Sequence, residues 1–135
     1  MKIDYNLIKN ILQFINNNEF YQIKGYDLSK EFDCHCEYKR VSNILGTPNK
    51  EDIEKEKLHN KKINNFLSHI QLLYDNRCLG INAYPEDIRI VNNNNIRIMP
   101  NGYELLYILN NFDITQSIEK NIPISIIIKK YKNEI

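Results

Sequence analysis

The feature that most constrains the fold is a change in the spacing of apolar side chains along the chain. Over residues 63–74 apolar side chains recur every three or four positions, which is typical of a helix with one buried face. Over residues 88–98 they alternate with polar side chains, which is typical of strands. The spacing therefore predicts a long helix over residues 58–76, followed by a β-hairpin whose strands are residues 88–91 and 96–98.

The alternation also predicts how the two strands of this hairpin pair. If Ile90 shares a face with Ile96, then Arg89 lies across from Arg97, which requires an odd loop of about three or five residues. The loop contains the asparagines of residues 92–95, and asparagine tolerates the left-handed backbone of such tips. Both arginines are therefore expected to project from the same outer face.

Shorter apolar patterns predict the remaining elements. They are a first helix capped by Asp4 and reaching Ile15, a strand over residues 20–23, a brief helix capped by Asp27, a strand over residues 79–84, a helix from Pro100 to Asn111, and a final helix within residues 122–135. An edge strand over residues 124–128 is the alternative for the final segment.

This order of elements predicts an α+β fold of the winged helix-turn-helix type. Three helices are followed by a β-hairpin wing and C-terminal helices, and the third helix is the one that usually enters DNA in such proteins. Residues 33–57 break the pattern and are interpreted as an insertion between helices 2 and 3. A length of 135 residues predicts a single domain over residues 1–135.

The charge balance argues against a dedicated DNA-binding protein without excluding one. Eighteen basic residues face seventeen acidic ones, which leaves a net charge of +1. DNA-binding proteins usually carry a basic excess, because neutralising phosphates supplies much of their affinity. The acidic stretch of residues 51–56 lies in the predicted insertion and would oppose DNA there.

The sequence predicts a cytoplasmic protein that is not embedded in a membrane. The segment at residues 1–6 lacks the apolar core of a signal peptide, and no window reaches the roughly 18 apolar residues of a membrane span. Three cysteines cannot all pair within one chain, which favours a reducing compartment.

No catalytic motif is legible, so we expect a protein that is not an enzyme and has neither a metal nor another cofactor. Cys34-His35-Cys36 suggests a metal site completed by a distant His or Cys, or a Cys–His nucleophile pair. Structural zinc sites usually combine two pairs of closely spaced ligands, and a second pair is missing. Ordinary reduced cysteines in a loop are the favoured interpretation.

Three blocks of the chain resemble a known family. Residues 4–15, residues 69–73 with 79–81, and residues 96–106 are similar to domain-of-unknown-function family 2513 and, more distantly, to YjcQ-type proteins. The resemblance implies a winged-helix fold and a phage, prophage or other mobile-element context. It implies no established activity and therefore transfers no catalytic residue. This chain has Asn76-Arg77 where the family typically has glycine.

The leading functional hypothesis is a dimeric, double-stranded-DNA-binding regulator. Lys and Arg side chains bind phosphate or guanine, Asn side chains read adenine, and Ser side chains hold phosphate. The predicted DNA-binding residues are Lys61, Lys62, Asn64, Asn65 and Ser68 on the long helix, with Arg89 and Arg97 on the wing.

The alternative hypothesis is a protein-binding accessory factor or inhibitor, for example a phage anti-defence protein that binds a host protein. Apolar side chains that lie outside the predicted buried faces of the helices suit an interface with such a partner, or with a second copy of the chain. The predicted partner-binding residues are Leu72, Ile124, Ile126 and Ile128. Docking of the C-terminal isoleucines into the chain's own core is the competing interpretation.

Overall fold

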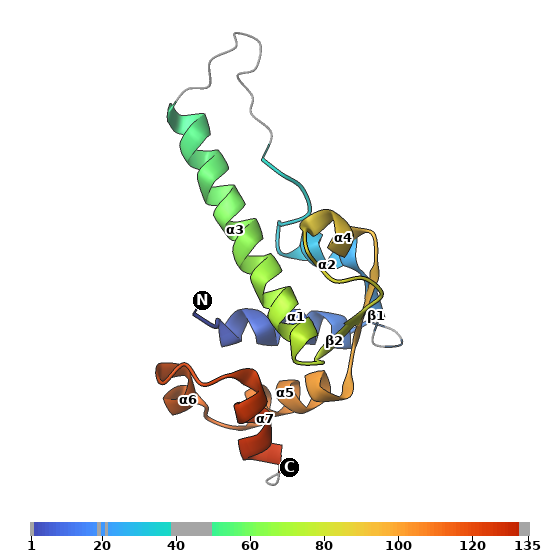
Figure 1. Cartoon of the computed structure of the whole chain (residues 1–135), viewed down its shortest axis with the longest axis vertical. Helices are drawn as coiled ribbons and strands as arrows, with labels where there is room; N and C mark the ends of the chain where they lie inside the picture. The colour runs from blue at the N-terminus through green and yellow to red at the C-terminus, as the bar shows by residue number, and fades with distance from the viewer. Residues whose placement is uncertain (1, 19, 21, 39–49, 133–135) are drawn as a thin grey trace.

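A computed structural model of the chain describes residues 2–18, 20, 22–38 and 50–132 (Figure 1). Within these residues it forms an α+β fold, which confirms the predicted class. Seven helices accompany a three-stranded antiparallel sheet. The elements are α1 (Tyr5–Asn16), β1 (Gln22–Lys24), α2 (Gly25–Glu31), α3 (Lys50–Asp75), β2 (Leu79–Ile81), α4 (Ile88–Asn92), β3 (Asn95–Ile98), α5 (Pro100–Asn111), α6 (Thr115–Glu119) and α7 (Ile124–Lys132).

The first helix forms as its sequence predicts. The side chain of Asp4 caps α1 by accepting a hydrogen bond from the Leu7 N–H at 3.1 Å. Ile8, Leu12 and Ile15 recur on one face and are fully buried. The apolar face of α1 thus lies at the centre of the core.

The long helix α3 is also confirmed, and it begins at Lys50 instead of residue 58. Phe66, Ile70 and Leu73 bury its C-terminal half against α1 and β2. The N-terminal part extends beyond the other labelled helices and strands (Figure 1). Residues 50–57 of the predicted insertion are therefore the first turns of α3, and residues 39–49 lie outside the described residues.

The sheet has the strand order β1-β3-β2, with β3 in the centre. Ile96 of β3 is level with Ile23 of β1 and Ile81 of β2, and all three side chains are buried. Arg97 is level with Gln22 and Gly80 and belongs to the opposite, outer face. One face of the sheet therefore packs on the helices.

The predicted hairpin of residues 88–91 and 96–98 is wrong. β3 pairs with β2 and β1, while residues 88–92 form the short helix α4. The Asp87 side chain caps α4 by accepting from the Ile90 N–H at 3.0 Å, and Ile88 and Val91 are buried one turn apart. Ile88 and Ile90 are two residues apart, as in a strand, whereas Ile88 and Val91 are three apart, as in a helix, and the cap favours the helix.

Close packing against α2 holds α4 in place. A Cβ atom on Gly25 would lie only 1.6 Å from the carbonyl oxygen of Val91, so only glycine permits this approach. Asn92 accepts a hydrogen bond from the Ser29 hydroxyl and donates one to the His35 carbonyl. The connection between β2 and β3 is thereby anchored to α2, and the predicted asparagine-rich tip does not form.

The C-terminal helices lie on the side of α1 away from α2 and α4 (Figure 1). α5 begins with Pro100 in its first turn, as predicted, and α7 confirms a helix over the final segment. The hydroxyl of Tyr5 donates to the Ile122 carbonyl at 2.7 Å, and burial raises the pKa of Tyr5 to about 12. The sequence did not predict α6. In the described ranges, no helix has the length and apolar character needed to span a bilayer.

A buried histidine joins α3 to the start of α1. His69 is fully buried, and its Nδ1 lies 2.7 Å from the Asn65 carbonyl oxygen. Its Nε2 accepts the backbone N–H of Asp4 at 2.9 Å. A ring with its hydrogen on Nδ1 satisfies both partners. His69 therefore determines where the N-terminus of α1 meets α3.

We expect His69→Ala to lower the free energy of unfolding by about 2–4 kcal/mol, because it creates a cavity and leaves the Asp4 N–H without its partner. Urea denaturation followed by circular dichroism measures the change. His59→Ala, on a more exposed part of the same helix, is the matched control and should lose less than about 1 kcal/mol. Equal losses of unfolding free energy in the two variants would contradict the proposed role of His69 in joining α3 to α1.

Candidate nucleic-acid interface

The outward face of α3 carries most of the predicted DNA-binding residues. Burial of Ile63 and Phe66 fixes the rotation of the helix about its axis. Lys61 and Asn65 are consequently exposed on the side of the helix opposite its buried face, as their spacing predicts, and Asn64 is exposed beside them. A further predicted residue, half-buried on the same face, is Ser68, whose hydroxyl donates to the Asn64 carbonyl at 2.7 Å.

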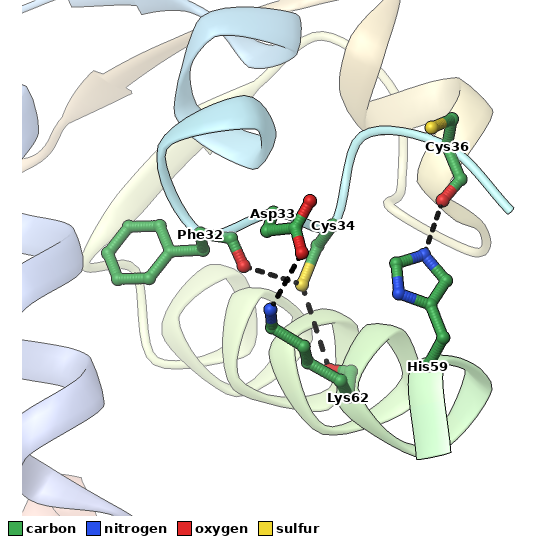
Figure 2. Close-up of polar contacts among 6 residues, drawn as sticks. All are labelled: Phe32, Asp33, Cys34, Cys36, His59 and Lys62. Carbon is green, nitrogen blue, oxygen red and sulfur yellow. Dashed lines mark hydrogen bonds and ion pairs between the residues drawn. The ribbon is translucent and has the colours of Figure 1, made fainter. Parts of the chain in front are cut away.

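The segment after α2 docks against this helix (Figure 2). Asp33 ends α2 in the left-handed region, with φ of 54°, and the Cys34 N–H donates to the Ser29 carbonyl at 2.8 Å. Further along, the His59 Nε2 donates to the Cys36 carbonyl at 2.7 Å. Residues 33–38 therefore lie along α3, beside the predicted DNA-binding face.

Docking of this segment changes the role of Lys62. Its Nζ lies 3.1 Å from Oδ2 of Asp33, forming an ion pair (Figure 2). The hydrogen bond from Lys62, and then its positive charge, lower the pKa of the Asp33 carboxyl. Sequence analysis did not identify Asp33 as a partner, since the two residues are far apart in the chain. Lys62 is thus partly neutralised within the protein.

The two neighbouring cysteines have different environments. The Cys34 thiol is buried and points to α3, where it lies 3.8 Å from the Lys62 carbonyl oxygen, whereas the Cys36 thiol is exposed and points away (Figure 2). Burial raises the pKa of Cys34 to about 11 and that of Cys78 to about 12. In the part of the chain that the structure describes, no three potential ligands gather around a common metal position.

Two hollows border the docked segment. One, of about 410 Å³, is lined by Asn64 of α3 and by Glu37, Glu56 and Asp87. The other, of about 490 Å³, is lined by Glu37 and by Arg89 of α4. The fold thus brings Asn64 and Arg89 to the same region of the surface, together with Glu56 of the acidic stretch and two carboxylates, Glu37 and Asp87, that sequence analysis had not assigned to it.

Arg97 does not line either of these two hollows. The expected pairing of Arg89 with Arg97 is wrong, because Arg89 belongs to α4 and Arg97 faces Gln22 and Gly80 in the sheet. Arg97 lines a different hollow, at the C-terminal end of α3. The two arginines therefore do not form one wing surface.

The four predicted partner-binding residues differ in how far their side chains are exposed. Ile124 and Ile128 are buried in the chain's own core, since α7 packs against α5. Leu72 is half-buried and packs against the same core. Ile126 remains 50% exposed on the opposite side of α7. Of the four residues, Ile126 offers the most surface to another molecule.

Comparison with known proteins supplies no further clue to function. No protein-family model, curated protein or solved structure matches the chain. The resemblance to domain-of-unknown-function family 2513 stays a prediction, and function has to be inferred from the residues of this chain.

We expect a thiol-specific reagent to modify only Cys36 in the folded protein at pH 8. Cys34 and Cys78 are buried, and their raised pKa values leave few reactive thiolates below about pH 10. Mass spectrometry after brief iodoacetamide treatment gives the count and position of the labels. Denaturant should expose all three thiols. Rapid labelling of Cys34 without denaturant would show that residues 33–38 detach readily from α3.

Proposed function

We propose that this chain is a double-stranded-DNA-binding protein with a winged-helix topology, in which α3 enters the major groove. The observation that carries the proposal is the element order α1-β1-α2-α3-β2-α4-β3 combined with the strand order β1-β3-β2. In a winged helix, three helices precede a pair of antiparallel strands whose connection forms the wing. In this proposal the connection over residues 82–94 corresponds to that wing.

The outward face of α3 has the chemistry that the proposal needs. Lys61 supplies a positive charge for phosphate, and the side-chain amides of Asn64 and Asn65 match the donor and acceptor pattern of adenine. None of these three side chains is buried by another part of the described chain. Their exposure is consistent with a helix face that serves an external partner.

Arg89 extends this surface from α3 to α4. It is exposed, and it borders the hollow next to the one that Asn64 lines. Because α4 is anchored against α2, Arg89 is held at a defined position relative to the docked segment. We propose that it contacts the phosphate backbone beside the major groove, while the outer-face residue Arg97 takes no part.

A dimer would be the functional unit of such a regulator, since winged-helix and related proteins commonly bind two half-sites. The exposed side chains of Tyr107 on α5 and Ile126 on α7 offer apolar area for this purpose. The phage or mobile-element context follows from the family resemblance alone and forms part of the same proposal.

We expect the protein to bind a labelled DNA duplex with an affinity that falls steeply as the salt concentration rises, because binding releases counterions from phosphates. Lys61→Ala and Arg89→Ala should each reduce the slope of log affinity against log salt by about one unit. Fluorescence anisotropy at several salt concentrations measures both quantities. Arg97→Ala is the matched control and should leave the slope unchanged. Absence of binding at low salt would refute the proposal.

The Asp33–Lys62 ion pair gives a second test. Asp33→Asn removes the carboxylate, which releases Lys62 to interact with phosphate, so DNA affinity should rise about two- to fivefold at low salt. The same anisotropy titration measures the DNA affinity of this variant. Glu119→Gln changes the net charge equally, on α6, and should have a smaller effect. Unchanged affinity in Asp33→Asn would place Lys62 outside the interface.

A protein ligand is the second candidate, and the acidic hollow beside α3 favours it. Glu37, Glu56 and Asp87 line that hollow and would repel phosphate. Leu58 is 68% exposed on the same helix, which suits an apolar contact with a basic partner protein. A protein that captures its partner through this hollow should lose the interaction in Glu37→Lys, whereas this change should strengthen binding to DNA.

A further inference from the structure

A hollow of about 490 Å³ lies at the junction of the C-terminal end of α3 with β2 and β3. It is separate from the surface assigned to DNA. Arg77 and Arg97 reach it from two different elements, and Tyr74, Asp75 and Met99 also line it. Gly80, the middle residue of β2, also lines the hollow.

Arg97 lies directly over the backbone of β2. A Cβ atom on Gly80 would be 2.8 Å from both Cζ and Nε of Arg97 and 3.0 Å from the Met99 sulfur. The absence of a side chain at Gly80 thus lets the guanidinium of Arg97 rest on the strand. Packing against β2 therefore determines the position of the guanidinium.

Arg77 occupies a position that favours glycine. It has φ of 59°, in the left-handed region, at the C-terminal end of α3. The Cys78 N–H donates to the Leu73 carbonyl at 2.8 Å, and the Arg77 N–H donates to the Tyr74 carbonyl at 3.0 Å, as in a glycine-terminated helix. An arginine is conformationally unfavourable there, which is a reason to look for a function in its side chain.

Neither guanidinium has an anionic partner among the ion pairs and hydrogen bonds of the described residues, although Asp75 lines the same hollow. Two guanidinium groups outnumber one carboxylate, and each presents several N–H donors. We propose that this hollow binds a small-molecule oxyanion, a phosphate or carboxylate, between Arg77 and Arg97, with the apolar body of the ligand against Tyr74 and Met99.

This proposal does not rest on DNA binding. Fourteen helical steps separate Lys61 from Asp75, the last residue of α3, which places their backbones about 21 Å apart along the helix axis, and Arg77 follows beyond that end. The hollow is also large enough for a ligand with a ring as well as a charged group. A small molecule therefore fits it better than a nucleic-acid backbone that follows the outward face of α3.

The test is a titration of the full chain, labelled with ¹⁵N, with phenyl phosphate and separately with benzoate, followed by NMR. We expect saturable shifts of the Gly80 amide and of the Arg97 Nε–H with at least one of the two probes. The probe that binds more tightly identifies phosphate or carboxylate as the ligand class. Sodium chloride at matched ionic strength is the reference. Shifts no larger than those with chloride, for both probes, would overturn the proposal.

Three variants localise the site. Arg97→Gln and Arg77→Gly should each weaken the tighter probe about tenfold, as expected for loss of a charge-assisted hydrogen bond. Arg77→Gly should also raise the melting temperature by about 2–4 °C, because glycine suits the left-handed backbone. Arg89→Gln removes the same charge outside the hollow and should change affinity less than twofold. An equal loss in Arg89→Gln, or none in Arg77→Gly and Arg97→Gln, would contradict the assignment.

Discussion

The structure depends on the packing of the C-terminal half of α3 against α1 and β2. Phe66, Ile70 and Leu73 are buried in this contact, and the His69 side chain ties the helix to the backbone N–H of Asp4. Burying large apolar side chains provides most of the favourable free energy, while the hydrogen bonds of His69 fix the position of one helix on the other. The outward face of α3 is consequently held in one orientation.

The same arrangement separates the surface of the chain into two chemically different regions. Docking of residues 33–38 and anchoring of α4 place Asn64 and Arg89 around one pair of hollows. The sheet register places Arg97 on an outer face, where it lines the same hollow as Arg77 at the end of α3. We propose that the first region binds an extended partner with mixed polar chemistry and that the second binds a compact anion.

Ion pairs within the chain neutralise some basic side chains and leave others available, although the net charge of the protein is close to zero. Lys62 is paired with Asp33, whereas the described ion pairs include neither Lys61 nor Arg89. Carboxylates at Glu37 and Asp87 lie nearby and limit how closely a phosphate backbone can approach. For the two proposed ligands, DNA and a basic protein, the balance between these groups would decide which one binds.

The local spacing of apolar residues determined the helices α1, α3, α5 and α7. The buried face of a helix has an apolar side chain every three or four residues, whichever element packs against it. This spacing determined the exposure of Lys61 and Asn65 for the same reason. Residues 88–92 have a spacing that fits both a strand and a helix, and only the Asp87 cap and the contact at Gly25 selected the helix. The burial of Ile124 and Ile128, the Asp33–Lys62 ion pair and the hollow that both Arg77 and Arg97 line depend on segments distant in the chain, so only tertiary packing decided them.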